Sequence, residues 1–238
     1  RALIITTMGG LALLTAIVLV AVRLGTTDLA AVLAARDHLL GTPVGHAVAA
    51  LLIVAAFTKS AQTPFSFWLP GAMVAITPVS AYLHAATMVK AGIYLLLRFT
   101  TVYAGQPGWS LTLLTVGLVT AIIGALRALR EHDLKSLLAY STVSQLGLLV
   151  AAIGVGTTVA LAAAVLHTFA HALFKATLFM LVGIIDREAG SRDIRQISGL
   201  RRVMPVTATL TGIAGLSLAG VAPLIGFVSK ESLFEGFA

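Results

Sequence analysis

The sequence contains no cysteine and little charge. Of its 238 residues, Asp, Glu, Lys and Arg make up 11%, less than half of the roughly 25% found in soluble domains, whereas apolar residues make up 58%. The lack of cysteine excludes disulfides, thiolate metal sites and cysteine-ligated iron–sulfur clusters from this stretch of chain, and it leaves the compartment open. Such a composition predicts an all-α, polytopic membrane protein.

Acidic residues are scarcer than basic ones, with 9 Asp and Glu against 16 Lys and Arg, so the net charge is +7. Most of the arginines lie in two loops, as the positive-inside rule predicts for membrane proteins, and no nucleic-acid partner is expected. No phosphate-binding glycine loop follows a strand-like segment, and no Ser/His/Asp arrangement is legible. Soluble-type catalysis therefore has no support.

Seven membrane spans fit the hydropathy, and two of them are interrupted. They are predicted at residues 2–24, 44–74 (broken), 76–99, 110–127, 133–153, 157–186 and 204–237 (broken). Thr27 or Asp28 is expected to cap a short interfacial helix that runs through Arg36. No linker divides the chain, so residues 1–238 are expected to form a single transmembrane domain. We expect this domain to be incomplete at both ends, because the chain starts without methionine and stops within an apolar run.

The first interruption is expected just after Lys59. A helix from Val44 to Met73 would be about 45 Å long at ~1.5 Å per residue, against a hydrocarbon core of roughly 30 Å. Pro64 removes a backbone donor and clashes with the preceding turn, and Pro70 does so again. A broken helix at membrane depth is tolerated only where protein or a water-filled cavity satisfies the freed backbone groups. We therefore expect Lys59 to face an internal hydrated site.

The second interruption is expected near the end of the chain, where Gly220, Pro223 and Gly226 precede Lys230. The broken spans are the second and the seventh, and this odd separation makes them run in opposite directions. Interrupted segments at corresponding positions of two halves are typical of a transporter site built from an inverted repeat. The basic residues of the loops around 127–135 and 187–202 share one side of the membrane, which we predict to be cytoplasmic.

Ionisable side chains in the sixth span are the strongest functional candidates. His167, His171 and Lys175 are spaced i, i+4 and i+8, so they project from one helix face. Ionisable residues inside a membrane are costly and usually mark ion or proton pathways. Imidazole can pass protons near physiological pH, and a desolvated lysine becomes a switchable carrier when a carboxylate approaches it. This pattern predicts a proton relay; the alternative is a packed helix with hydrogen-bonded histidines.

The third span contains His84, Thr87 and Lys90. On one continuous helix these residues would occupy a sector of about 120° at ~100° per residue, and they could line a wet interior. The alternative is a buried histidine bonded to a neighbouring carbonyl, with a lysine that extends to the membrane surface.

The fifth span begins with charge and continues with hydroxyl groups. Asp133 suits the N-terminal dipole of the helix. Lys135 is either an interfacial anchor or the central ionisable group of its span. Four polar side chains could hydrogen-bond across helices or to water in a pathway: Ser141, Thr142, Ser144 and Gln145.

Metal or haem binding is a competing role for the same histidines. The His-x3-His spacing lacks the glutamate of a zinc protease motif, and Lys175 one turn away would repel a cation, so no metal is expected. Haem held between His84 and the histidines of the sixth span would make the protein an electron carrier, and this alternative stays open.

Five spaced motifs cover the chain almost from end to end. They are Lys59–Pro64, Thr77–Ala81, His84–Gly92, Asp133–Gln145 and His167–Lys175. Together they resemble the antiporter-like core family, which is shared by Mrp-type multisubunit sodium/proton antiporters and the proton-pumping membrane subunits of respiratory complex I. The chain looks closest to the large A-type subunits of the Mrp branch, on the strength of Lys90, the Gly190–Ile194 loop and Ser229–Glu231. The distal pumping subunit of complex I is the near alternative.

The resemblance implies a set of functional residues. Lys59 would pair with a glutamate on an earlier helix, upstream of Arg1, and a line of basic groups would continue to the second broken span. The implied proton pathway is Lys59, His84, Lys90, His167, His171, Lys175 and Lys230, with Lys135, Thr87, Ser141, Ser144 and Glu231 as further candidates.

The resemblance also implies an activity. The chain would be part of a subunit of a multisubunit monovalent cation/proton antiporter, a secondary transporter and not an enzyme, which couples proton movement to sodium exchange across the cell membrane. Other membrane subunits, Na⁺, H⁺ and the lipid bilayer are its expected partners, and no cofactor is expected. The alternatives are a pumping subunit of NADH-quinone oxidoreductase, a haem-binding redox subunit, and a scaffold that conducts nothing.

Overall fold

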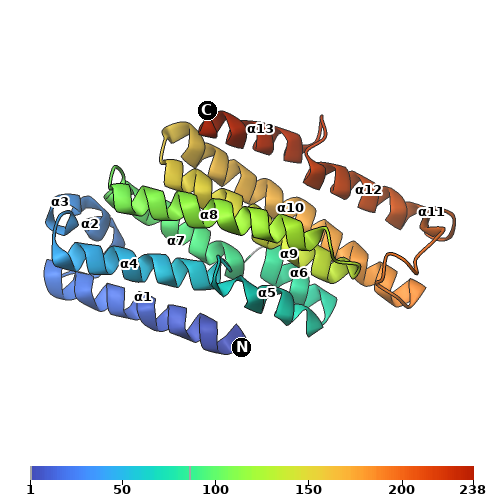
Figure 1. Cartoon of the computed structure of the whole chain (residues 1–238), viewed down its shortest axis with the longest axis horizontal. Coiled ribbons are helices and arrows are strands. Elements are labelled where there is room, and N and C mark those ends of the chain that lie inside the picture. Colours follow the sequence, from blue (N-terminus) through green and yellow to red (C-terminus); the bar gives the residue numbers. More distant parts are fainter. Residues whose placement is uncertain (1, 86) are drawn as a thin grey trace.

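The chain folds as a bundle of helices that lie along one long axis (Figure 1). The structure is a computed structural model that describes residues 2–85 and 87–238. Every regular element among these residues is a helix, as the all-α prediction requires. The segments long and apolar enough to cross a membrane are α1 (Ala2–Leu24), the α6–α7 pair (Thr77–Ala85 and Met88–Tyr103), α8 (Pro107–Ala128), α9 (Leu134–Val155) and α10 (Thr158–Ala189).

Two further crossings are broken, and both breaks fall where they were predicted. The first consists of α4 (Pro43–Lys59), η1 (Phe65–Phe67), α5 (Trp68–Gly71) and η2 (Ala72–Val74). The second consists of α12 (Pro205–Ala219) and α13 (Ile225–Phe237), preceded by the short α11 (Leu200–Val203). The seven predicted spans are therefore confirmed.

Protein groups satisfy the backbone that is freed at the first break. The Trp68 indole N–H donates to the Thr58 carbonyl oxygen at 2.9 Å, and the Gln62 side-chain amide donates to the Ser60 carbonyl oxygen at 2.9 Å. The Thr63 backbone N–H donates to Oγ1 of Thr120 on α8 at 2.9 Å. Unpaired backbone groups are costly at membrane depth. These contacts therefore hold the end of α4 in place, directly after Lys59.

The third span is also interrupted, and the prediction of one continuous helix is wrong. Thr87 forms a bend with φ −127° and ψ −83° between α6 and α7, while residue 86 lies outside the described residues. The Thr87 hydroxyl donates to the Tyr82 carbonyl oxygen at 3.2 Å, which ties the bend to α6. His84 and Lys90 therefore sit on separate helices, and the sector of about 120° expected for them does not apply.

The connector after α1 contains the expected short helix. Asp28, one of the two predicted caps, accepts a hydrogen bond from the Ala31 backbone N–H at 2.9 Å and starts α2 (Leu29–Ala34). The helix ends at Ala34 and not at the predicted Arg36, and a second turn, α3 (Arg36–Leu39), begins after Ala35. Val32 and Leu39 are buried, so the connector packs its apolar side against the bundle.

The two broken crossings run in opposite directions. In Figure 1, α4 runs from the end of the bundle that carries α2 and α3 toward its middle, whereas α12 and α13 run from the α11 end back toward the C-terminus. This confirms the antiparallel relation that an inverted repeat requires.

Glycines bring α8 and α9 into close contact. A Cβ atom added at Gly117 would lie 2.5 Å from the backbone nitrogen of Ala151, and one at Gly147 would lie 2.5 Å from that of Ala121. Small residues let membrane helices approach closely where the hydrophobic effect gives no driving force. This packing fixes one side of α9, while another side contacts α10.

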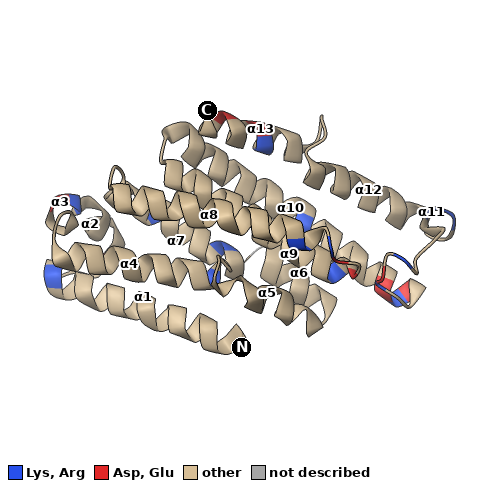
Figure 2. Ribbon diagram, in the orientation of Figure 1, with Lys and Arg blue, Asp and Glu red and all other residues tan. Residues whose placement is uncertain are grey.

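Charged residues gather mainly at the ends of the bundle (Figure 2). The loops around 127–135 and 187–202 meet at one end, where Asp133 and Asp193 form an isolated antiparallel bridge. Asp133 also caps α9, and its carboxylate pairs with Arg192 at 3.0 Å. Arg195 donates side-chain hydrogen bonds to Asp193, which lowers the pKa of that carboxyl to about 2. The predicted place of Asp133 at the N-terminus of its helix is confirmed, and ion pairs within the loop accompany it.

Candidate functional site: a line of buried basic side chains

The buried face of α10 carries three ionisable side chains. His167, His171 and Lys175 are each 0% exposed, as their spacing predicts. Helices α6, α9, α12 and α13 all pack against α10. Three helices that carry other candidates, α6, α9 and α13, therefore lie directly against this helix.

His167 connects α10 to two neighbouring helices. Its Nδ1 atom lies 3.0 Å from the hydroxyl oxygen of Ser229 on α13, and its Nε2 atom lies 2.8 Å from the amide oxygen of Gln145 on α9. Both ring nitrogens are thus paired with side chains that have no charge.

Lys175 reaches across to α9. Its ammonium group donates to the Leu138 carbonyl oxygen at 3.0 Å and to the hydroxyl oxygen of Ser141. The candidate Ser141 is therefore a direct partner of the line.

Lys90 connects α7 to α10. Its ammonium group donates to the Thr168 carbonyl oxygen at 2.6 Å, beside His167 and less than one turn from His171. Although the third span is interrupted, its lysine thus reaches the same helix as the histidines.

His84 and His171 are buried without a hydrogen-bond partner. Among the described residues, no protein group bonds to either ring nitrogen of these two side chains. The His84 ring instead lies 4.8 Å from that of Phe179, and the His171 ring lies 5.4 Å from that of Phe174, measured between centroids. A buried imidazole carries at least one N–H group that needs an acceptor. Water is the group that would satisfy these nitrogens, as the hypothesis of a wet interior requires.

Lys59 ends α4 and borders the helix that carries Lys90. It lines a cavity of about 230 Å³ together with residues of α1, α4 and α7, including Gly9, Ala91 and Gly92. A Cβ atom added at Gly92 would overlap the Ala56 carbonyl oxygen, so α4 and α7 are in close contact here. The cavity is mostly apolar in its lining, and the hydration of Lys59 stays a prediction.

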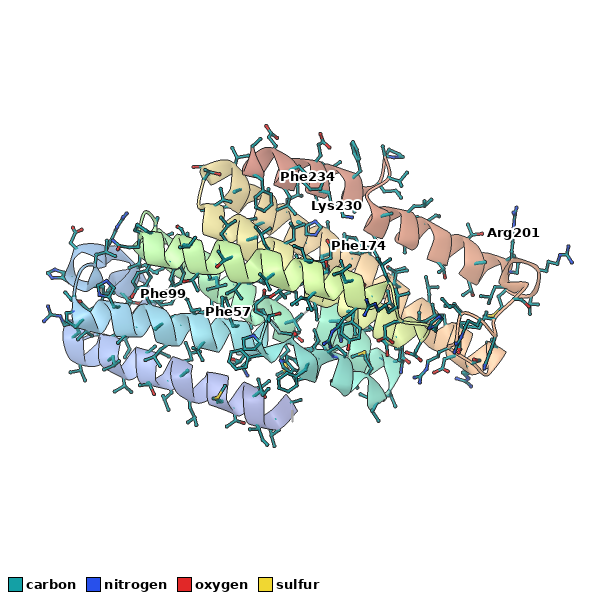
Figure 3. The ribbon with its side chains drawn as sticks, in the orientation of Figure 1. Phe57, Phe99, Phe174, Arg201, Lys230 and Phe234 are labelled. Atoms are coloured by element: carbon teal, nitrogen blue, oxygen red, sulfur yellow. The ribbon has the colours of Figure 1, made fainter. Side chains whose placement is uncertain are left out.

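Lys230 closes the second break. Figure 3 labels it on α13 near the junction with α12. Its ammonium group donates to the carbonyl oxygens of Leu218 at 2.7 Å and Ala219 at 3.2 Å, the last residues of α12. A helix C-terminus has unpaired carbonyls and a partial negative charge, so the lysine compensates both. Lys59 likewise lies at a helix C-terminus, at the end of α4.

The remaining candidates are placed in different surroundings. Lys135 lies in the first turn of α9, is only 3% exposed, and donates to the Ala75 carbonyl oxygen at 3.1 Å; it is thus a buried contact at the end of the bundle. Ser144 packs against α8, where a Cβ atom at Gly124 would lie 2.6 Å from its backbone nitrogen. Glu231 is exposed on α13, and the Thr87 hydroxyl is bonded within its own bend. The structure does not bring Ser144, Glu231 or Thr87 to the line.

Gln145 hydrogen-bonds across helices, as its residue type predicted, whereas Ser229 is a partner that residue-type reasoning did not assign to the pathway. Gln145 lies four residues after Ser141, so a helical period places both on one face of α9, and this spacing is a usable signal. Ser229 gives no comparable signal, because its approach to His167 depends on the packing of α13 against α10.

No carboxylate pairs with the line in the part of the chain that the structure describes. The three ion pairs among the described residues join loop or helix-end residues only: Arg192 with Asp133 and Asp186, and Arg195 with Asp193. The lysines of the line are instead bonded to carbonyl and hydroxyl oxygens. The glutamate expected to pair with Lys59 would lie upstream of Arg1.

These features define a multi-pass membrane protein with two oppositely directed broken helices and buried basic groups between them, the architecture of transporter repeats. The chain belongs to the NADH:quinone oxidoreductase/Mrp antiporter transmembrane family, whose profile matches residues 1–238. The resemblance seen in the sequence is thereby confirmed.

Similar proteins point to the antiporter branch of this family. The chain is 51% identical over 233 residues to the A/B subunit of a probable K⁺/H⁺ antiporter of Rhizobium meliloti. It is 44% identical over 248 residues to the A1 subunit of a Na⁺/H⁺ antiporter of Staphylococcus epidermidis. These matches cover 98% and 99% of the chain, but only 23% and 31% of the relatives. The chain thus spans about a quarter to a third of their length.

Two solved structures share the fold. The Mrp complex from Dietzia sp. DQ12-45-1b contains a chain that is 55% identical, with a TM-score of 0.93 over 99% of this chain and 26% of that one. An archaeal respiratory complex, the membrane-bound sulfane sulfur reductase, contains a chain that is 28% identical, with a TM-score of 0.89 over 99% of this chain and 49% of that one.

Proposed function

We propose that this chain forms part of a subunit of a multisubunit monovalent cation/proton antiporter and carries protons along a line of buried and half-buried basic groups. The line consists of Lys59, His84, Lys90, His167, His171, Lys175 and Lys230. The observation that carries the proposal is the buried face of α10, where three ionisable side chains meet groups from α7, α9 and α13. The names of the similar proteins support the same activity.

Proton transfer along the line follows from the residue types. Imidazole can accept a proton at one ring nitrogen and release one from the other, so a histidine passes protons without leaving its place. The ring nitrogens of His84 and His171 have no protein partner among the described residues, so they would be free to bond to water that transfers protons to the neighbouring lysines. When a lysine of the line gains or loses its proton, the electrostatic energy of the neighbouring ionisable group would change, because charges interact strongly in a medium of low dielectric constant.

The proposal extends to the surroundings of the chain. Its loops around 127–135 and 187–202 would face the cytoplasm, because they hold most of the arginines, and the membrane would be the cell membrane. Residues 1–238 would act as one antiporter-like domain within a longer subunit. The partners would be other membrane subunits, the exchanged ions would be H⁺ and Na⁺, and no cofactor or enzymatic step would be needed. One relative is named for K⁺, so potassium is the competing cation.

The test is cation/proton exchange by the full complex in proteoliposomes. Lys59→Ala and His171→Ala should abolish proton-gradient-driven sodium exchange, whereas Leu173→Ala, on an exposed part of α10, should leave the rate unchanged. Each variant must first be shown to assemble by size-exclusion chromatography. Intact exchange in both pathway variants would remove the proposal and favour a scaffold without conduction.

A redox role makes a different prediction. The archaeal respiratory complex shows that this fold also occurs in a respiratory membrane assembly. A b-type haem bound by the purified subunit would give a Soret band and contradict the transporter proposal. A spectrum without this band, together with exchange that needs no electron donor, would support it.

A further inference from the structure

We propose that Gln145 and Ser229 are positioning residues, which fix the tautomer of His167 and connect its protonation to the second helix break. This inference rests on the proposed function, because it assigns roles to the two partners of a line histidine. Neither residue needs to carry charge for this role.

Gln145 sets which ring nitrogen carries the proton. Its amide oxygen lies 2.8 Å from Nε2 of His167, and an amide oxygen can only accept a hydrogen bond. Nε2 therefore carries the hydrogen, and in the neutral ring Nδ1 has the free lone pair. That lone pair faces the Ser229 hydroxyl oxygen, 3.0 Å away, so the one Ser229 hydrogen is shared between Nδ1 and its other acceptor.

Ser229 has a second partner, which makes its hydroxyl sensitive to the charge of His167. Its hydroxyl also donates to the carbonyl oxygen of Gly226 at 3.2 Å. When Nδ1 takes up one proton from the line, it becomes a donor, and the Ser229 oxygen must accept from it. The Ser229 hydrogen then turns to Gly226. When Nδ1 releases the proton, the Ser229 hydrogen is again shared between Nδ1 and the Gly226 carbonyl, so only one proton is gained and lost.

The Gly226 carbonyl lies at the junction of the two half-helices. The Gly226 backbone N–H donates to the Ser217 hydroxyl oxygen at 3.3 Å, and a Cβ atom at Gly226 would overlap the Ser217 carbonyl oxygen. Lys230, next to Ser229, holds the last two carbonyls of α12. A proton on His167 thus changes a hydrogen bond one turn from the group that closes the break.

The test compares serine variants of α13 in the full complex. Ser229→Ala removes the hydroxyl that faces His167 and should lower exchange by roughly 5- to 10-fold, the effect of losing one orienting hydrogen bond. Ser229→Thr keeps the hydroxyl and should restore most of the rate. Ser232→Ala is the matched control, because the Ser232 hydroxyl is bonded to its own helix at the Val228 carbonyl and does not contact the line.

A spectroscopic measurement separates positioning from general packing. ¹⁵N NMR of histidine-labelled complex in nanodiscs, with the His167 signal assigned from His167→Gln, should show the Nε2–H tautomer. Gln145→Met should give a mixture of tautomers, and Ser229→Ala should shift the Nδ1 signal. If Ser229→Ala does not assemble, Gln145→Met provides the same test.

The outcomes distinguish this inference from the proposed function. If His167→Ala leaves exchange intact, the proton line itself is wrong. If His167→Ala abolishes exchange, but Ser229→Ala and Gln145→Met change neither the rate nor the ¹⁵N spectrum, the positioning role is wrong and the line stands.

Discussion

Lys175 offers the sharpest distinction between a transport group and a structural contact. It is fully buried, and its ammonium group bonds only to oxygens of Leu138 and Ser141 on α9 among the residues that the structure describes. We predict that Lys175→Met, which keeps the length of the side chain but removes its charge, leaves the complex assembled and abolishes transport.

The contacts around Lys175 determine the expected stability change. After the substitution, the Leu138 carbonyl still accepts from the Thr142 hydroxyl at 2.9 Å and from the Ser141 hydroxyl at 3.0 Å. The Ser141 oxygen loses Lys175 as a donor, but its own hydrogen stays paired with Leu138. Replacing a buried charge by an apolar side chain of similar shape is often neutral or stabilising. The free energy of unfolding should therefore change by no more than about 1 kcal/mol.

The transport effect should be far larger. Removing a group that gives and takes protons typically costs about 10²-fold or more. The assay is sodium-driven dye quenching in proteoliposomes, with size-exclusion profiles as the control for assembly and Leu173→Met as the matched variant on α10. Wild-type exchange by Lys175→Met would refute the reasoning, and loss of the assembled complex would show that Lys175 is a structural contact.

Three further predictions follow from packing and charge. Asp133→Ala removes the cap of α9 and the Arg192 pair, so the free energy of unfolding should fall by about 1 kcal/mol in denaturant titrations; an unchanged midpoint would contradict the cap. Gly147→Ala should destabilise by roughly 1–3 kcal/mol because its Cβ would meet the backbone of α8, whereas Gly212→Ala, with open space around it, should not; equal effects would contradict the packing. The contribution of Asp193 to loop order should be complete above its ordinary pKa of 3.8 and be lost as the pH falls through about 2, so hydrogen exchange of residues 191–197, corrected for intrinsic rates, should stay constant from pH 7 to pH 5.

Much of the fold was predictable because membrane helices carry strong local signals. Long apolar runs indicate the seven spans, and the prolines after Lys59 indicate the first break at the correct residue. The break at Thr87 was missed because no proline or glycine lies beside it. The bend depends instead on surroundings that the local sequence does not encode, such as the packing of α6 against α10.

The site was predictable where one helix carries it. The i, i+4, i+8 spacing places His167, His171 and Lys175 on one buried face, and the structure has them there. The partners of these groups come from other helices, so the pairing of His167 with Ser229 and of Lys90 with the Thr168 carbonyl depends on tertiary packing. The same holds for Lys135, whose bond to Ala75 is made across two spans.

The central claim is that buried basic groups are joined by water and pass protons. A cryo-EM map of the complete antiporter at a resolution that shows ordered water tests it most directly. The account predicts water bound to the ring nitrogens of His84 and His171, which have no protein partner among the described residues. A continuous chain of water should lead from these nitrogens to Lys175. Dry apolar packing around both rings, with each lysine held by a fixed partner, would contradict it.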